Sequence, residues 1–153
     1  MYPKQHLFFG ILLIIFLFIL HPEMGIIGIS IILFSTLLID IDQYIYYIYK
    51  KKYWSLINAY NFFNNKIKKV SSFPREKRNN LYVGFYFLHG FEIAFIMILL
   101  SYFSKYFLFA FVGISFHLLL DIVVQTTYWD RLDKISLIYD YLKFRNGKYI
   151  SLS

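Results

Sequence analysis

The chain has 153 residues, which fits a single domain, and 59% of them are hydrophobic while 16% are charged. With a mean hydropathy of +0.54, this composition lies well above that of an ordinary soluble domain and favours an integral membrane protein. The chain has no cysteine, which excludes disulfides and thiolate metal sites. Its net charge is +7, and the positions of the basic residues along the chain are more informative than this sum.

The first two apolar segments predict a helical hairpin. Residues 7–20 and 24–39 are apolar runs of 14 and 16 residues, separated by the turn His21-Pro22-Glu23. As helices they are about 21 and 24 Å long, less than the ~30 Å hydrocarbon core, so the predicted spans are extended to 6–20 and 24–42. A signal peptide is the alternative for the first run, but no small-residue cleavage site follows it.

Residues 43–80 have a different character. Tyrosine and lysine residues are interleaved in the first half of this segment, and a polar stretch surrounds Pro74 in the second half. Amphipathic aromatic rings beside lysines are typical of a membrane–water interface, which predicts an interfacial helix followed by a polar linker. A basic, aromatic segment can also bind nucleic acid, but no recognition motif supports that partner, and we expect the lipid bilayer instead.

Two more apolar segments, 81–103 and 106–124, predict a third and a fourth span joined by a short turn. The polar and basic residues 128–153 predict a tail that contains one weak amphipathic helix. The sequence thus predicts an all-α, polytopic membrane protein. Its transmembrane domain, residues 1–127, is expected to be an up-down bundle of four helices with an interfacial loop.

The charge distribution orients this predicted bundle. Fifteen basic residues lie on the side of Lys4, the 43–80 loop and the tail, whereas Lys105 alone lies on the other side. By the positive-inside rule, both termini and the loop are then cytoplasmic, and the protein is expected in the inner cell membrane.

Polar residues that interrupt the apolar segments all fall at the cytoplasmic end of the predicted bundle: His6, Asp40, Asp42, His89, Glu92, His117 and Asp121. A carboxylate inside a membrane helix costs roughly 2.5–3.5 kcal/mol at the centre and less near the ends. No Lys or Arg lies inside the apolar spans, so protons, a network with the histidines or a divalent cation must neutralise the carboxylates. Imidazole and carboxylate ligands without thiolates suit Zn²⁺, with Mn²⁺ or Fe²⁺ as alternatives. We therefore predict that all seven residues bind metal, through one ion with a second shell or through two ions.

The spacing of these residues agrees with a shared site. His117 and Asp121 are four residues apart, so they share one helix face, and His89 and Glu92 share a face at a spacing of three. The side chains of Asp40 and Asp42 diverge by about 200° on a regular helix, so both can be ligands only if the helix ends or distorts there. A metal-free network of hydrogen bonds among the same groups is the alternative.

Taken in order, the polar elements resemble the YdjM-like family of membrane-bound metal-dependent hydrolases. The resemblance covers about residues 6–124 and rests on these elements: His6 with Phe9-Gly10, Asp40-Ile41-Asp42, His89, and His117-Leu-Leu-Leu-Asp121. The chain departs from the family pattern in lacking a proline before Asp40, in having Gly84 where a further histidine is expected, and in the acidic Glu92.

The resemblance implies hydrolysis, and the family's distant similarity to zinc phospholipase C and P1-type nucleases implies a phosphoester substrate. The metal would activate water, and Glu92 or Asp42 would be the catalytic general base. A site at head-group depth beside a basic loop suits a phospholipid-like substrate. The alternatives are a non-enzymatic membrane protein, whose polar cluster is structural or binds ions, and a soluble helical bundle.

Overall fold

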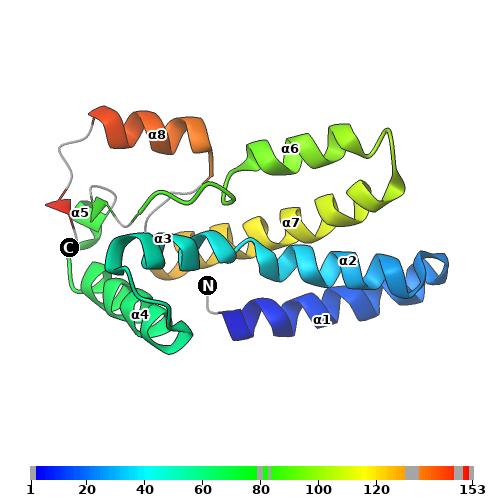
Figure 1. Ribbon diagram of the computed structural model, residues 1–153, viewed down its shortest axis with the longest axis horizontal. Helices are drawn as coiled ribbons and strands as arrows, with labels where there is room; N and C mark the ends of the chain where they lie inside the picture. The colour runs from blue at the N-terminus through cyan, green and yellow to red at the C-terminus, as the bar shows by residue number, and fades with distance from the viewer. Residues whose placement is uncertain (1–2, 79–80, 83, 130–134, 147–149, 152–153) are drawn as a thin grey trace.

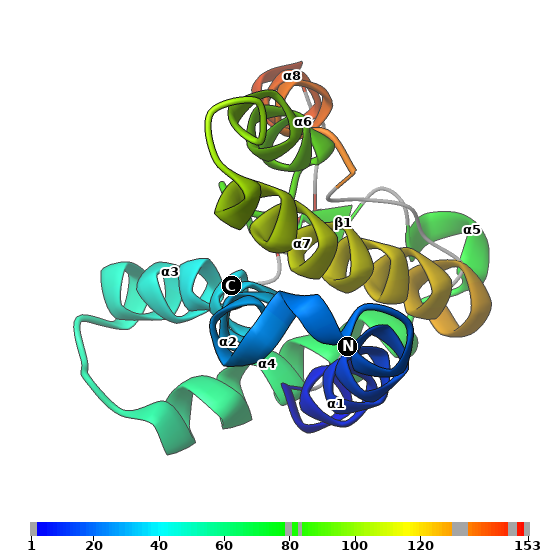
Figure 2. The same ribbon diagram turned by 90° about the vertical axis from the view of Figure 1, so that its right-hand side faces the viewer.

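The computed structural model describes residues 3–78, 81–82, 84–129, 135–146 and 150–151, which are mainly helical. Four apolar helices are aligned along the long axis of the molecule (Figure 1): α1 (Pro3–Leu20), α2 (Gly25–Leu38), α6 (Phe91–Leu100) and α7 (Lys105–Val124). α7 is the central helix, since it packs against α2, α6 and α1 (Figure 2). The predicted all-α architecture is therefore confirmed.

The predicted hairpin between the first two apolar segments is also confirmed. After α1, a single 3₁₀ turn, η1 (Pro22–Met24), reverses the chain into α2. Proline suits the start of such a turn because its φ is fixed and it has no N–H to satisfy. Gly25 follows with a φ of 61°, a conformation that glycine adopts without strain. α6 and α7 form a second hairpin, in which the Ser104 hydroxyl caps α7 by accepting from the Tyr106 amide.

The second predicted span, 24–42, is interrupted near its end. α2 stops at Leu38, the chain turns at residues 39–40, and α3 (Ile41–Lys51) then begins. Ile39 fills the turn with a buried side chain, which joins Ala94 of α6 and Ile114 of α7 in a small apolar core. The interruption therefore lies against α6, which carries Glu92, and α7, which carries His117 and Asp121.

The 43–80 segment is more helical than its sequence indicates. After α3, Ser55 caps α4 (Leu56–Ser71) by accepting a hydrogen bond from the Asn58 amide, and α5 (Arg75–Arg78) follows Pro74. α4 packs against α3, so the expected single interfacial helix is in fact a pair. In the described part of the polar linker expected around Pro74, residues 72–74 lead into the short α5.

The helix predicted over 81–103 is much shorter in the structure. Its first part holds a two-residue strand, β1 (Leu81–Tyr82), which pairs in parallel with β2 (Ile150–Ser151), and a non-helical stretch that ends at Gly90. The backbone is extended at Gly90, so α6 begins only at Phe91 and has 10 residues. A helix of that length is about 15 Å long, roughly half of a hydrocarbon core. The weak amphipathic helix predicted in the tail is present as α8 (Leu137–Asn146).

Among the described residues, two helical segments are long and apolar enough to cross a membrane, Pro22–Lys51 and Lys105–Tyr128. Only 22% and 28% of their most apolar windows are buried, whereas the core helix of a soluble protein is mostly buried. Large apolar side chains along α1 are exposed as well, including Phe8, Phe16 and Ile19. An exposed apolar surface of this extent marks contact with another apolar phase or protein.

α2 and α7 approach each other closely at Gly113. A Cβ at this position would meet the Ser35 hydroxyl oxygen and lie 2.5 Å from the backbone oxygen of Ile32. The Thr36 hydroxyl lies in the same contact and donates to the Ile32 carbonyl at 2.7 Å. The contact therefore has no room for a side chain on α7.

We predict that Gly113→Ala lowers the free energy of unfolding by about 1–3 kcal/mol, because the added methyl group overpacks this contact. Gly10→Ala is the matched control, since a Cβ there would lie at an ordinary 3.5 Å from the Thr36 Cγ2 methyl. Thermal unfolding of the detergent-purified variants measures the difference. Equal melting temperatures for the two variants would contradict the prediction.

Candidate metal centre

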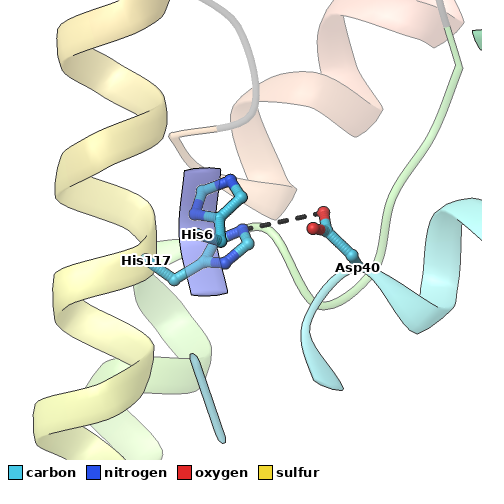
Figure 3. Close-up of side chains that lie close together, drawn as sticks. All are labelled: His6, Asp40 and His117. Carbon is cyan, nitrogen blue, oxygen red and sulfur yellow. Dashed lines mark ion pairs between the residues drawn. The ribbon is translucent and has the colours of Figure 1, made fainter. Parts of the chain in front are cut away.

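Polar side chains from four separate segments converge at one end of the aligned helices. His6 comes from the first turn of α1, and Asp40 from the turn between α2 and α3. His89 comes from the non-helical stretch before α6, and His117 and Asp121 lie one turn apart on α7. The three imidazoles are fully buried, and the Asp121 and Asp40 side chains are 6% and 16% exposed. Figure 3 shows the His6 ring lying over the His117 ring, with the Asp40 carboxylate directed toward them.

The distances between facing nitrogen and oxygen atoms of this cluster fall between 3.3 and 3.8 Å. His6 Nε2 is 3.3 Å from Asp121 Oδ1, and His89 Nε2 is 3.4 Å from Asp40 Oδ1. His117 Nε2 is 3.7 Å from Asp121 Oδ2 and 3.8 Å from Asp40 Oδ1. Most of these separations are too long for good hydrogen bonds. They are close to the ~3.4 Å that separates ligand atoms around a tetrahedral cation with bonds of about 2.1 Å.

Hydrogen bonds behind the rings fix which nitrogen faces the cluster. His117 Nδ1 lies 2.7 Å from the Thr36 backbone oxygen, which can only accept, so Nδ1 carries the proton and Nε2 the lone pair. His89 Nδ1 lies 3.0 Å from Asp42 Oδ2, which also accepts from the Leu88 amide at 2.8 Å. Both Nε2 atoms therefore present lone pairs to the cluster. Carbonyl or carboxylate partners of this kind orient the histidine ligands of metal sites.

Several of the buried nitrogens lack hydrogen bonds. Within the part of the chain that the structure describes, neither ring nitrogen of His6 nor the Nε2 of His117 has a hydrogen-bond partner. The two rings stack with their centroids 3.9 Å apart and their planes 12° apart, which keeps these atoms close together. A buried polar atom without a partner costs roughly 1–3 kcal/mol. A divalent cation would satisfy the lone pair of His117 Nε2 and the single lone pair of a neutral His6 ring, so the residues present fit a metal.

Two overlapping groups of residues could each hold a metal ion, because the possible ligand atoms within each group lie within 4.8 Å of one another. The first is His6, Asp40 and His117, and the second is His89, His117 and Asp121. Both groups need His117, whose Nδ1 is already bonded to Thr36, so this histidine offers one lone pair only. The two groups are therefore better described as parts of one site around His117 Nε2 than as two independent sites.

Asp40 and Asp42 face opposite edges of the His89 ring. The helix does break at this point, as required for both to be ligands, and the break turns Asp40 toward Nε2. Asp42 follows inside the first turn of α3 and contacts Nδ1, on the edge of the ring that points away from the cluster. Its place supports the second-shell alternative, and the geometry offers no support for Asp42 as the catalytic base.

Glu92 has different partners from those its sequence position predicts. Its carboxylate accepts from the Ser136 hydroxyl at 2.5 Å and from the amides of Leu137 and Ile138 at 3.0 and 3.3 Å. These amides open α8, so Glu92 acts as a cap that also meets the positive end of the helix dipole. The structure groups the other predicted residues at the cluster and directs Glu92 to α8 instead, which removes the geometric basis for a ligand or catalytic-base role.

Two contributors to the cluster were not foreseen. The Gln43 side-chain amide donates to Asp40 Oδ1 at 2.7 Å and lies 3.2 Å from His89 Nε2. The spacing of three between Asp40 and Gln43 on a helical segment was a usable signal for this pair. No feature of the sequence points to the backbone carbonyl of Thr36, because every residue has a backbone carbonyl. Only the packing of α2 on α7 brings this one to His117.

Comparison with known proteins found no matching protein-family model, no matching curated protein and no matching solved structure.

We predict that purified protein binds a divalent metal, and that His117→Ala and Asp121→Ala each weaken this binding by at least roughly 10–100-fold, because each removes a central donor. His21→Ala is the matched control, since His21 is exposed and pairs with Glu23 in the opposite turn. Mass-spectrometric metal analysis after supplementation with Zn²⁺, Mn²⁺ or Fe²⁺ measures the effect. Wild-type protein that stays free of metal would contradict the site.

We predict that Glu92→Ala leaves the metal content unchanged and lowers the free energy of unfolding by about 0.5–2 kcal/mol, as expected for the loss of a helix cap. Metal analysis and thermal unfolding of the same preparation separate the two roles. A loss of metal comparable to that of Asp121→Ala would instead return Glu92 to the ligand set.

Proposed function

We propose that this protein is a membrane-embedded, metal-dependent hydrolase that acts on a phosphoester at the cytoplasmic face, in the manner that its resemblance to the YdjM-like family implies. The observation that carries the proposal is the cluster of three imidazoles and two carboxylates, which contains two overlapping groups of possible metal ligands. Among the described residues, the ring nitrogens of His6 and the Nε2 of His117 have no hydrogen-bond partner. A buried polar cluster with a purely structural role normally satisfies such atoms through its own hydrogen bonds, so the state of His6 and His117 favours a ligand site.

The residues of the cluster have different roles in the proposed reaction. A bound divalent cation would lower the pKa of a water molecule and polarise a phosphoryl oxygen. His6, His89, His117 and Asp121, the more deeply buried groups, hold that ion. Asp40, which is 16% exposed on the side chain, is the carboxylate best placed to take a proton from water at the edge of the site. Asp42 and Thr36 keep the rings of His89 and His117 in their metal-binding tautomers.

Membrane insertion is supported by the exposed apolar surface and by the two segments that are long and apolar enough to cross. α1, whose apolar part covers residues 7–20, adds about 21 Å of apolar helix beside them. In this arrangement the cluster lies at the same end of the helices as the lysine-rich α3 and α4, which the positive-inside rule assigns to the cytoplasm.

A non-enzymatic role is the second candidate, and one observation favours it. The Gln43 amide already bridges Asp40 and His89, so part of the cluster forms a hydrogen-bonded network without any ion. In that case the cluster would be a structural element or an ion-binding site, and its loss would lower stability rather than a reaction rate.

We predict that metal-loaded wild-type protein hydrolyses a phosphodiester, and that Asp40→Asn lowers the rate roughly 10²–10⁴-fold, the range for loss of a general base. Glu23→Gln, which alters an exposed carboxylate in the opposite turn, is the matched control. Rates on bis-p-nitrophenyl phosphate and on mixed phospholipid micelles are measured beside thermal unfolding. A melting temperature that falls in Asp40→Asn, with no hydrolysis by the loaded wild type, would establish the non-enzymatic role.

A further inference from the structure

A groove runs between α4 and the end of α2 with the start of α3. It has a volume of about 510 Å³, within the range of small-molecule sites. The lining is mostly apolar and comes from both walls, with Leu37 and Ile41 on one side and Ala59, Phe63 and Ile67 on the other. α3 and α4 lie side by side in both views of the fold (Figures 1 and 2). The groove therefore offers an elongated apolar surface rather than a polar pocket.

The polar part of the groove is shared with the metal centre. Asp40 and Gln43 line the groove, and the same Asp40 Oδ1 atom is 3.4 Å from His89 Nε2 and 3.8 Å from His117 Nε2. The Gln43 amide lies between this oxygen and the His89 ring. A molecule that occupies the apolar groove therefore has its polar end within reach of the cluster.

The surroundings of the groove are positively charged and partly apolar at the surface. α3 ends in Lys50 and Lys51, and α4 ends near Lys68 and Lys69, so both helices that form the groove carry basic last turns. The first turn of α4 exposes Leu56 by 71%. Lysines next to exposed apolar side chains favour contact with an anionic bilayer surface. The pair of helices that forms the groove is thus suited to an anionic lipid surface, while the charged residue that lines the groove itself is Asp40.

We propose that the groove between α3 and α4 binds the acyl chain of an anionic, phosphate-bearing membrane lipid, with its head group at Asp40 and Gln43. This inference rests on the proposed function and gives its substrate class, a membrane phospholipid rather than a soluble phosphodiester. Gln43 is a positioning residue in this arrangement, because its amide can donate to the head group in place of Asp40. The apolar lining selects for the chain, and the lysines in the last turns of α3 and α4 favour contact of the helix pair with an anionic bilayer surface.

The test uses the full chain in nanodiscs that contain phosphatidylglycerol with a diazirine on its acyl chain. After irradiation, mass spectrometry locates the labelled residues. We expect labelling in residues 37–44 and 56–67, and about a tenfold decrease in Ile67→Trp, whose added ring fills the groove. Ile57→Trp is the matched control, because Ile57 lies on α4 and is 75% exposed, and it keeps wild-type labelling. Ala59→Leu provides a second, smaller obstruction if Ile67→Trp fails to fold.

The outcomes separate this inference from the proposed function. Equal labelling of Ile67→Trp, Ala59→Leu and wild type would overturn the lipid groove, since both substitutions fill part of it. Metal content, measured on the same samples, tests the metal site independently. Wild-type protein that labels in the groove but holds no metal would support the lipid groove and overturn the hydrolase.

Discussion

The close contact between α2 and α7 is the interaction on which the rest of the structure depends. At Gly113 the two backbones approach with no side chain from α7 between them, and one turn later the Thr36 carbonyl accepts from His117. The same contact that holds the helices together thus fixes the tautomer of the central histidine. His6 of α1 then stacks on that ring. A displacement of α7 along α2 would therefore change the packing and the chemistry of the cluster together.

The interruption between α2 and α3 gives the site its second essential element. A continuous helix would direct Asp40 and Asp42 to nearly opposite sides. The turn at residues 39–40 instead brings the two carboxylates to the two edges of one imidazole, with Asp40 facing the cluster and Asp42 behind it. Gln43 extends this arrangement to the groove beside α4. One short turn thus connects the donor atoms, the group that orients them and the groove.

Much of this could be predicted from the sequence, and the failures have physical causes. The apolar runs and the turn at Pro22 predicted the first hairpin, because burial and proline geometry are local signals. The convergence of His6, His89 and His117 followed from helix direction alone. Glu92 was predicted to be a ligand because it lies in an apolar segment, whereas its partner in the structure, Ser136 at the start of α8, lies 44 residues later in the chain. The non-helical stretch before α6 was missed because its apolar composition resembles that of a span.

The shortness of α6 has a consequence for the surroundings of the cluster in a bilayer. A helix of 10 residues leaves a hydrophobic mismatch on its flank, which a membrane relieves by thinning locally. The stretch from Gly84 to Gly90 has non-helical backbone, and such backbone is tolerated at membrane depth only when protein covers it or when it borders water. Because this stretch carries His89, the thinned flank would bring the aqueous phase down to the level of the imidazoles. In the proposed membrane arrangement, the helix that is too short to span the bilayer would thus be the one that gives the buried cluster access to water.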